Sequence, residues 1–299
     1  MTSYAPKRPA DAPTGTRAAT DPVVPELHTR RSLLVYLSYG WLLVVVAAAL
    51  LAGVLPLASY AVPVGPPRQA PEFGSLDLLL GTDGQGRSIL SRCVYGAQVS
   101  LVVGAVAGCV GAVFGTALGM TAGYLGGRWD SAVRLVTDAL LAFPPLILLL
   151  ALSSILTPSV RTLLAGLTLL TVPSFVRLGR AATLAWAGRD FVQAARTLGA
   201  GRRRILVREV LPNAAPSLGA YLPVVMAALL VAEGSLSFLG MGIPPPRPSW
   251  GGMIADGKDT IADAPHIVFV PALVIFLTVF ALNQTGDHLR RRFDRTLHD

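Results

Sequence analysis

The feature that most constrains this sequence is a series of six apolar runs, each about as long as a bilayer is thick. A helix needs about 20 apolar residues to cross the hydrocarbon core. Only 14% of the 299 residues are charged and the mean hydropathy is +0.58, whereas soluble domains carry about 25% charged residues. We therefore predict an all-α membrane protein with six transmembrane helices, at Leu33–Leu57, Val99–Met120, Val133–Leu156, Leu163–Val176, Leu218–Leu239 and Ile267–Leu282.

The basic residues between these runs predict the orientation, because Lys and Arg concentrate in cytoplasmic segments. With the N-terminus inside, 19 of the 25 Lys and Arg residues lie on the cytoplasmic side. Both termini are therefore expected in the cytoplasm. The formal net charge of +8 is then mainly an orientation signal, and we expect no nucleic-acid partner.

The same pattern divides the chain into segments. Residues 1–31 are rich in Pro, Ala, Thr and charge, which predicts a disordered cytoplasmic tail. Residues 32–98 would hold the first helix, which is too long for a signal-peptide core, and an extracytoplasmic loop. Residues 99–286 would form the core bundle, with a long cytoplasmic loop at 177–217, and residues 287–299 a cytoplasmic tail.

Helix breakers and small residues inside the runs suggest how the helices are used. Prolines that interrupt a span persist where a cavity or a neighbouring helix satisfies the freed carbonyls, which suits a transport pathway; they are Pro144, Pro145, Pro173, Pro223 and Pro271. Glycines four or so apart let another backbone approach closely; in the second run they are Gly104, Gly108, Gly111, Gly115 and Gly119.

The cytoplasmic loop has a helix, hinge, helix pattern. Asp190 is a candidate cap for a short helix through Leu198, Gly199–Gly201 break it, and a second helix from Arg202 is expected to end at Leu211, before Pro212. Four residues would share one small apolar patch: Phe191, Ala194, Ala195 and Leu198. Such a patch fits either a solvated surface helix or an element received by the groove of a partner protein.

Two acidic residues lie within the apolar runs. Glu233 is about 25 Å along its helix from Pro216, near the outer interface. A carboxylate there either serves the transport pathway or ties a helix end by hydrogen bonds; Ser237 lies one turn further on. Asp138 is one turn from Arg134, which predicts a structural ion pair.

Catalysis and nucleotide binding by this chain are not expected. The four histidines are scattered, and neither they nor Cys93 and Cys109 show metal-ligand spacing. Gly252–Lys258 fits most of a phosphate-binding loop, but Asp259 replaces the Ser or Thr that would ligate magnesium. We predict no catalytic residue, no metal site and no cofactor in this chain.

Several motifs together resemble one family. Gln193-Ala194-Ala195, then Gly199 and Leu211-Pro212, resemble the EAA loop of ABC importer permeases, although the family usually has Glu in place of Gln193. Further segments resemble the second, C-type permease of its dipeptide, oligopeptide and nickel branch: Leu80–Asp83 with Gly86-Arg87, Tyr95–Ala97, Thr137-Asp138, Ala142–Pro144, Ala232-Glu233, Ser235–Gly240, Trp250-Gly251, Gly286-Asp287 and Leu289-Arg290.

The resemblance implies a type I importer permease bundle in a prokaryotic plasma membrane. Its partners would be membrane lipid, a second related permease, two cytoplasmic ATPases or one fused ATPase that bind ATP and magnesium, and an extracytoplasmic substrate-binding lipoprotein. The coupling element would comprise Phe191, Gln193, Ala194, Ala195, Leu198, Gly199, Leu211 and Pro212; Glu233 and Ser237 are candidates for the pathway. The loop at about Ser59–Gln98 would face the binding protein.

The resemblance implies di- or oligopeptides as cargo. Ser88 stands where the branch often has Asp, and Gly252 where it often has Asn, so nickel or another small solute such as glutathione stays open. A self-sufficient ion-coupled transporter is a further alternative, but it would favour charges near the middle of the membrane.

Overall fold

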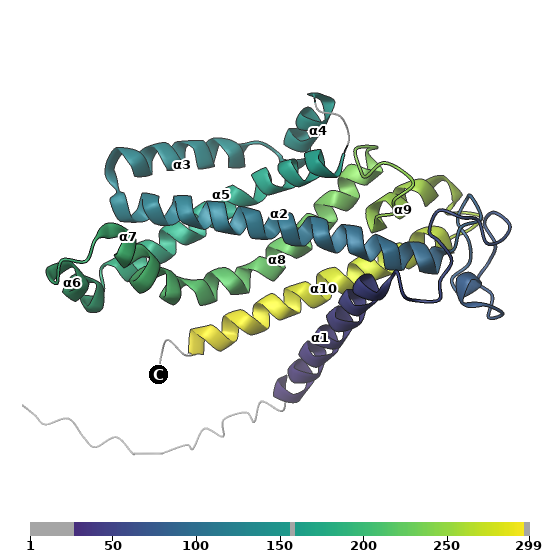
Figure 1. Cartoon of the computed structure of the whole chain (residues 1–299), viewed down its shortest axis with the longest axis horizontal. Helices are drawn as coiled ribbons and strands as arrows, with labels where there is room; N and C mark the ends of the chain where they lie inside the picture. The colour runs from purple at the N-terminus through teal and green to yellow at the C-terminus, as the bar shows by residue number, and fades with distance from the viewer. Residues whose placement is uncertain (1–26, 156–158, 296–299) are drawn as a thin grey trace, which may run out of the picture.

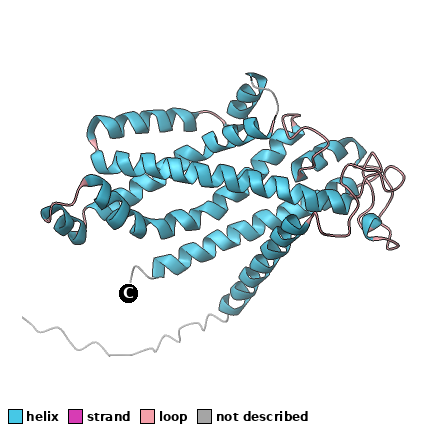
Figure 2. Cartoon of the chain, viewed as in Figure 1, coloured by secondary structure: helices cyan, strands magenta, loops and turns pink. Residues whose placement is uncertain are grey.

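The computed structural model describes residues 27–155 and 159–295, and these residues are almost entirely helical (Figure 2). Within this part of the chain the only β-pairing consists of two isolated bridges in the loop before residue 89. Most of the predicted N-terminal tail lies outside the described residues. Its last five residues, Leu27–Arg31, instead begin the first helix.

Five long helices dominate the structure: α1 (Leu27–Leu51), α2 (Ile89–Leu125), α5 (Val160–Ala187), α8 (Leu211–Phe238) and α10 (His266–Arg295). The shorter elements are η1 (Leu76–Leu78), α3 (Gly127–Ala142), α4 (Pro145–Ile155), α6 (Asp190–Thr197), α7 (Arg202–Arg204), η2 (Ile205–Val210), α9 (Trp250–Gly257) and η3 (Lys258–Thr260). The spans containing the five long helices are long and apolar enough to cross a membrane, and α3 with α4 makes a sixth if this bent pair is one span. The predicted number of spans is therefore confirmed in this form.

The long helices run lengthwise, with distinct structures at the two ends of the bundle (Figure 1). At one end lie α6 and α7. At the other lie α9 and the loop that joins α1 to α2. The C-terminal end of α10 is directed toward the α6 end, as is the start of α1, which agrees with the prediction that both termini and the α6 region share one side of the membrane.

Several helices are longer than the apolar runs predicted, whereas α1 ends at Leu51, before the predicted end at Leu57. Ile89–Gln98, expected in the outer loop, form the first turns of α2, and residues 177–187, expected in the cytoplasmic loop, complete α5. Residues 287–295, expected as a tail, continue α10. The reason is that hydropathy marks only the part of a helix that can lie in lipid, while polar turns continue the helix beyond it.

Only one of the predicted proline breaks divides a helix. Between α3 and α4 the chain bends by 90°. Phe143 has an extended conformation with ψ 132°, as the steric effect of the following Pro144 favours. Pro173, Pro223 and Pro271 lie inside continuous helices, so the expected interruptions there are wrong. A membrane helix tolerates them when its neighbours satisfy the freed carbonyls.

The glycines of α2 serve close packing, as predicted. α2 makes its most extensive contact with α5. A Cβ atom added to Gly115 would lie 2.6 Å from the carbonyl oxygen of Val172 and 2.7 Å from Cβ of Phe175. The Oγ1 of Thr171 donates a hydrogen bond to the Ala107 carbonyl across the same contact, at 3.3 Å. The two backbones therefore approach through glycine rather than through interleaved large side chains.

Candidate functional site

The connection from α5 to α8 contains the helix, hinge, helix pattern, and its first helix is α6. The N-cap of α6 is Arg189, which makes no side-chain capping bond. The prediction that Asp190 caps the helix is therefore wrong, because Asp190 is the first helical residue. Its carboxylate still lies in the first turn, where the helix dipole favours negative charge.

The end of α6 is formed by backbone bonds around Gly199. The Gly199 N–H donates to the Arg196 carbonyl at 2.9 Å, and the Ala200 N–H donates to the Ala195 carbonyl at 2.9 Å. This is a Schellman ending, which requires a left-handed residue. Gly199 has φ +81°, so the helix ends at the first glycine of the predicted Gly199–Gly201 break.

One buried residue fixes α6 against the bundle. Val192 is fully buried in a cluster with Met120 of α2 and with Ile205 and Val210 of η2. The sequence did not indicate this role, because a single valine among polar neighbours gives no periodic signal. The guanidinium of Arg196 adds a second attachment, 4.9 Å above the Tyr124 ring of α2.

The opposite side of α6 carries exposed apolar residues. Phe191 is 41% exposed and Leu198 is 87% exposed, and Ala194 between them is exposed as well. Ala195 is half-buried, because it lies between this face and the side of Val192. We call Phe191, Ala194, Ala195 and Leu198 the coupling patch, after the role that the resemblance to the EAA loop implies for them. Gln193 lies away from it, and its amide donates to the Gly188 carbonyl at 3.2 Å.

The prediction that the second helix of this loop ends at Leu211, before Pro212, is wrong, because both residues lie within a continuous helix. The chain is continuously helical from Arg202 to Phe238. The Leu211 N–H donates to the Leu206 carbonyl, five residues back, as part of the π-helical turn η2. Since Pro212 has no N–H to donate, a widened turn here accommodates it. Leu211 also packs against the cluster around Val192, so α8 and α6 share this packing.

The predicted ion pair between Asp138 and Arg134 is wrong. Arg134 Nε instead lies 3.4 Å from the Oδ2 of Asp130, and Asp130 accepts two hydrogen bonds from Arg180 of α5, at 2.5 and 2.8 Å. Asp138 pairs with Arg177 of α5 at 2.8 Å. Arg134 therefore pairs with the aspartate one turn before it rather than one turn after it. The partners Arg180 and Arg177 come from the packing of α3 against α5, which spacing along one helix could not reveal.

Glu233 and Ser237 form a buried tie. Glu233 is 1% exposed, and its Oε1 accepts hydrogen bonds from Ser237 Oγ at 2.9 Å and from Ser249 Oγ at 2.8 Å. Ser249 is the N-cap of α9. This arrangement links α8 to α9 and favours the structural alternative that the sequence left open. The neighbouring Gly252–Lys258 stretch is mostly the α9 helix, whereas a phosphate-binding loop precedes its helix.

These features describe an integral membrane protein: a bundle of bilayer-length helices with an exposed apolar element at one end. Residues 115–298 match the family described as binding-protein-dependent transport system inner membrane component. The glutathione transport system permease protein GsiD of Escherichia coli O6:K15:H31 is 39% identical over 220 residues, covering 74% of this chain and 73% of that protein. GsiD of Shigella boydii serotype 4 gives the same values. The chain therefore belongs to this family of inner membrane components.

Two solved structures share the fold. A chain of the inward-facing MetNI methionine ABC transporter, from an SeMet soak crystal form, matches with a TM-score of 0.57 and 19% identity, covering 68% of this chain and 96% of that one. A native crystal form matches with a TM-score of 0.55. The chain therefore has the fold of these ABC transporter chains. Its family and its GsiD relatives make it a permease subunit, which is a non-catalytic membrane component.

Proposed function

We propose that this chain is one of two related permease subunits of an ATP-driven importer for short peptides. The observation that carries the proposal is the coupling patch on α6, within a chain of the binding-protein-dependent family. The patch lies at the end of the bundle that the basic residues assign to the cytoplasm, where an ATPase would receive it. A binding protein would deliver the cargo to the opposite end.

The geometry supports a lever between the ATPase and the bundle. α6 is attached to the rest of the chain through Val192 and through the shared cluster with η2, which continues directly into α8. A force applied to the coupling patch would therefore reach α8 through packed side chains and a continuous helix. In this proposal, movement of the ATPases exchanges an inward opening for an outward one, with the cargo site between the two permeases.

Glutathione is a second candidate cargo, and a specific observation favours it. The relatives at 39% identity are permeases of a glutathione transport system. Glutathione is itself a tripeptide with an unusual linkage, so both candidates share amide groups and free carboxylates. Nickel shares neither.

Uptake measurements separate these cargoes. Deleting the gene should reduce uptake of labelled trialanine to background, because the import pathway is lost, and nickel accumulation should not change. Restoring the gene should restore peptide uptake. Loss of glutathione uptake with trialanine uptake intact would establish the second candidate, and loss of nickel uptake alone would contradict the peptide proposal.

A further inference from the structure

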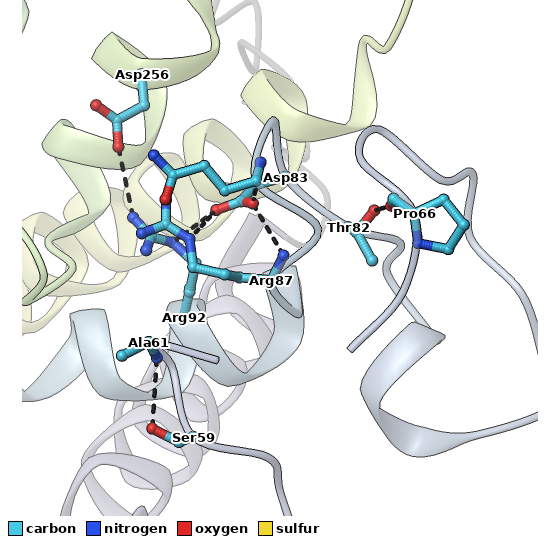
Figure 3. A network of polar contacts seen from close by, with 9 residues as sticks. Ser59, Ala61, Pro66, Thr82, Asp83, Arg87, Arg92 and Asp256 are labelled. Atoms are coloured by element: carbon cyan, nitrogen blue, oxygen red, sulfur yellow. Dashed lines mark hydrogen bonds and ion pairs between the residues drawn. The ribbon is translucent and has the colours of Figure 1, made fainter. Parts of the chain in front are cut away.

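The outer end of the chain contains a cavity that the coupling mechanism does not use. Its volume is about 860 Å³, within the range of small-molecule sites. One wall comes from the loop before α2 and the first turns of α2, and the other from the segment between α8 and α10. Figure 3 shows the polar side chains that meet there: Asp83, Arg87 and Arg92 from the first wall and Asp256 of α9 from the second.

The floor of the cavity holds two arginines that share one buried aspartate. Asp83, Arg87 and Arg92 are 6%, 7% and 4% exposed. The Oδ2 of Asp83 lies 2.7 Å from Arg87 Nε and 3.4 Å from Arg92 Nε. Its Oδ1 accepts the backbone N–H groups of Gln85 and Arg87, at 2.8 and 3.0 Å. The carboxylate of Asp83 is thus fully engaged, and the buried group keeps one excess positive charge.

The guanidinium of Arg92 can donate more hydrogen bonds than it makes here. Its Nη1 is buried and has no hydrogen-bond partner among the residues that the structure describes. Its Nη2 lies 3.5 Å from Asp256 Oδ2, but the Asp256 side chain is 61% exposed, so water screens that pair. A buried guanidinium with an unmet N–H is destabilising unless an acceptor completes it.

The rim of the cavity adds further positive charge. Arg68 and Arg247 line it, and both are exposed. Arg68 has φ +60°, the only positive φ at a non-glycine residue among those described. Asp259 is the remaining acidic residue of the lining. Four arginines therefore face three aspartates, and the excess charge is positive.

We propose that this cavity is a carboxylate-binding site in which Arg92 on the floor and Arg247 at the rim hold the anion. A guanidinium presents parallel N–H groups that match the two oxygens of a carboxylate, and Arg92 lacks such an acceptor. The carboxylate could belong to the cargo or to an acidic side chain of the binding protein. A role for this site in transport rests on the proposed function. Binding of a carboxylate by the isolated chain does not depend on the proposed function.

The test is a calorimetric titration of the purified full-length chain in detergent with three probes: acetate, dialanine and aspartate capped at both backbone ends. Acetate tests the shared chemistry, dialanine represents a cargo terminus, and capped aspartate represents a protein side chain. We expect saturable binding of acetate and of at least one larger probe. Tighter binding of dialanine identifies the cargo as the source, and tighter binding of capped aspartate identifies the binding protein.

Three variants locate the site. Arg92→Gln should weaken binding of the carboxylate probes about tenfold, and Arg247→Gln about threefold, since it removes only a rim contact. Arg161→Gln, at an exposed arginine of α5 that does not line the cavity, should leave binding unchanged. If Arg92→Gln does not fold, Arg247→Gln still decides the question. Absence of saturable acetate binding, or wild-type affinity in Arg247→Gln and in any folded Arg92→Gln, would overturn the proposal.

Discussion

Replacing Ala194 with aspartate should abolish transport while the chain still reaches the membrane in normal amounts. Ala194 is an exposed residue of the coupling patch, so the substitution disturbs no packing within the chain. If the patch enters a groove of an ATPase, the new carboxylate is buried without a partner, at a cost of roughly 3 kcal/mol or more. Docking should weaken at least about a hundredfold, and stimulated ATP hydrolysis and transport in reconstituted vesicles should both fall to background.

Ala195→Asp should have the same effect, with an added cost because Ala195 is half-buried. Gly199→Val should also impair docking, but by changing the backbone at the end of α6. A Cβ at Gly199 would meet no atom within 4 Å, so crowding is not the cause of the expected defect. A β-branched residue at φ +81° is instead strained, and the Schellman ending that aims α6 should be lost.

The matched control for these variants is Gln193→Glu. It adds the same negative charge to α6, but at an exposed position away from the coupling patch, and it restores the residue usual in the resembling EAA loop. Transport should remain near the wild-type rate. Normal transport by Ala194→Asp, or an equal loss in Gln193→Glu, would show that the patch has no special role.

The second large effect is expected at the contact between α2 and α5. Gly115→Val would place a Cβ 2.6 Å from the Val172 carbonyl oxygen and 2.7 Å from Cβ of Phe175. The carbonyl belongs to the backbone of a packed helix and cannot rotate away. We expect the two helices to separate, with a loss of at least about 3 kcal/mol. Folded protein should largely disappear, measured as the monodisperse peak in size-exclusion chromatography of a fluorescent fusion.

Gly40→Val serves as the comparison, because Gly40 is also a helical glycine but a Cβ there meets nothing within 4 Å. Its folded yield should match the wild type. Similar yields of Gly115→Val and Gly40→Val would mean that the close contact between α2 and α5 does not limit folding.

The sequence predicted the spans and their order, because a helix in lipid needs a long run of apolar side chains and such runs are directly visible as high hydropathy. It did not predict where the helices end. Residues 177–187 and 287–295 are polar enough to suggest loops, yet they continue α5 and α10. Among the prolines, only the break at Pro144 divides a helix, since local sterics do not reveal whether neighbours can satisfy a freed carbonyl.

The candidate site shows the same division between local and distant effects. The conformation of Gly199 was predictable, since a helix that stops needs a left-handed residue. The burial of Val192 and the pairing of Asp138 with Arg177 were not, because they depend on elements far apart in the chain. A hydrogen-bonded role for Glu233 could be predicted from an acidic residue within an apolar run. Its partner Ser249, the N-cap of α9, could be identified only from the fold.

The most direct test of the central claim is a cross-linking measurement at Leu198, which is more exposed than Phe191, the other large residue of the coupling patch. Leu198→Cys, in membranes that contain the whole importer, should cross-link to an ATPase subunit, and a membrane-impermeant thiol reagent added outside intact cells should not label it. Gln85→Cys, at the outer cavity, should be labelled from outside and should not cross-link to the ATPase. External labelling of Leu198→Cys, or the absence of any ATPase cross-link from it, would contradict the account.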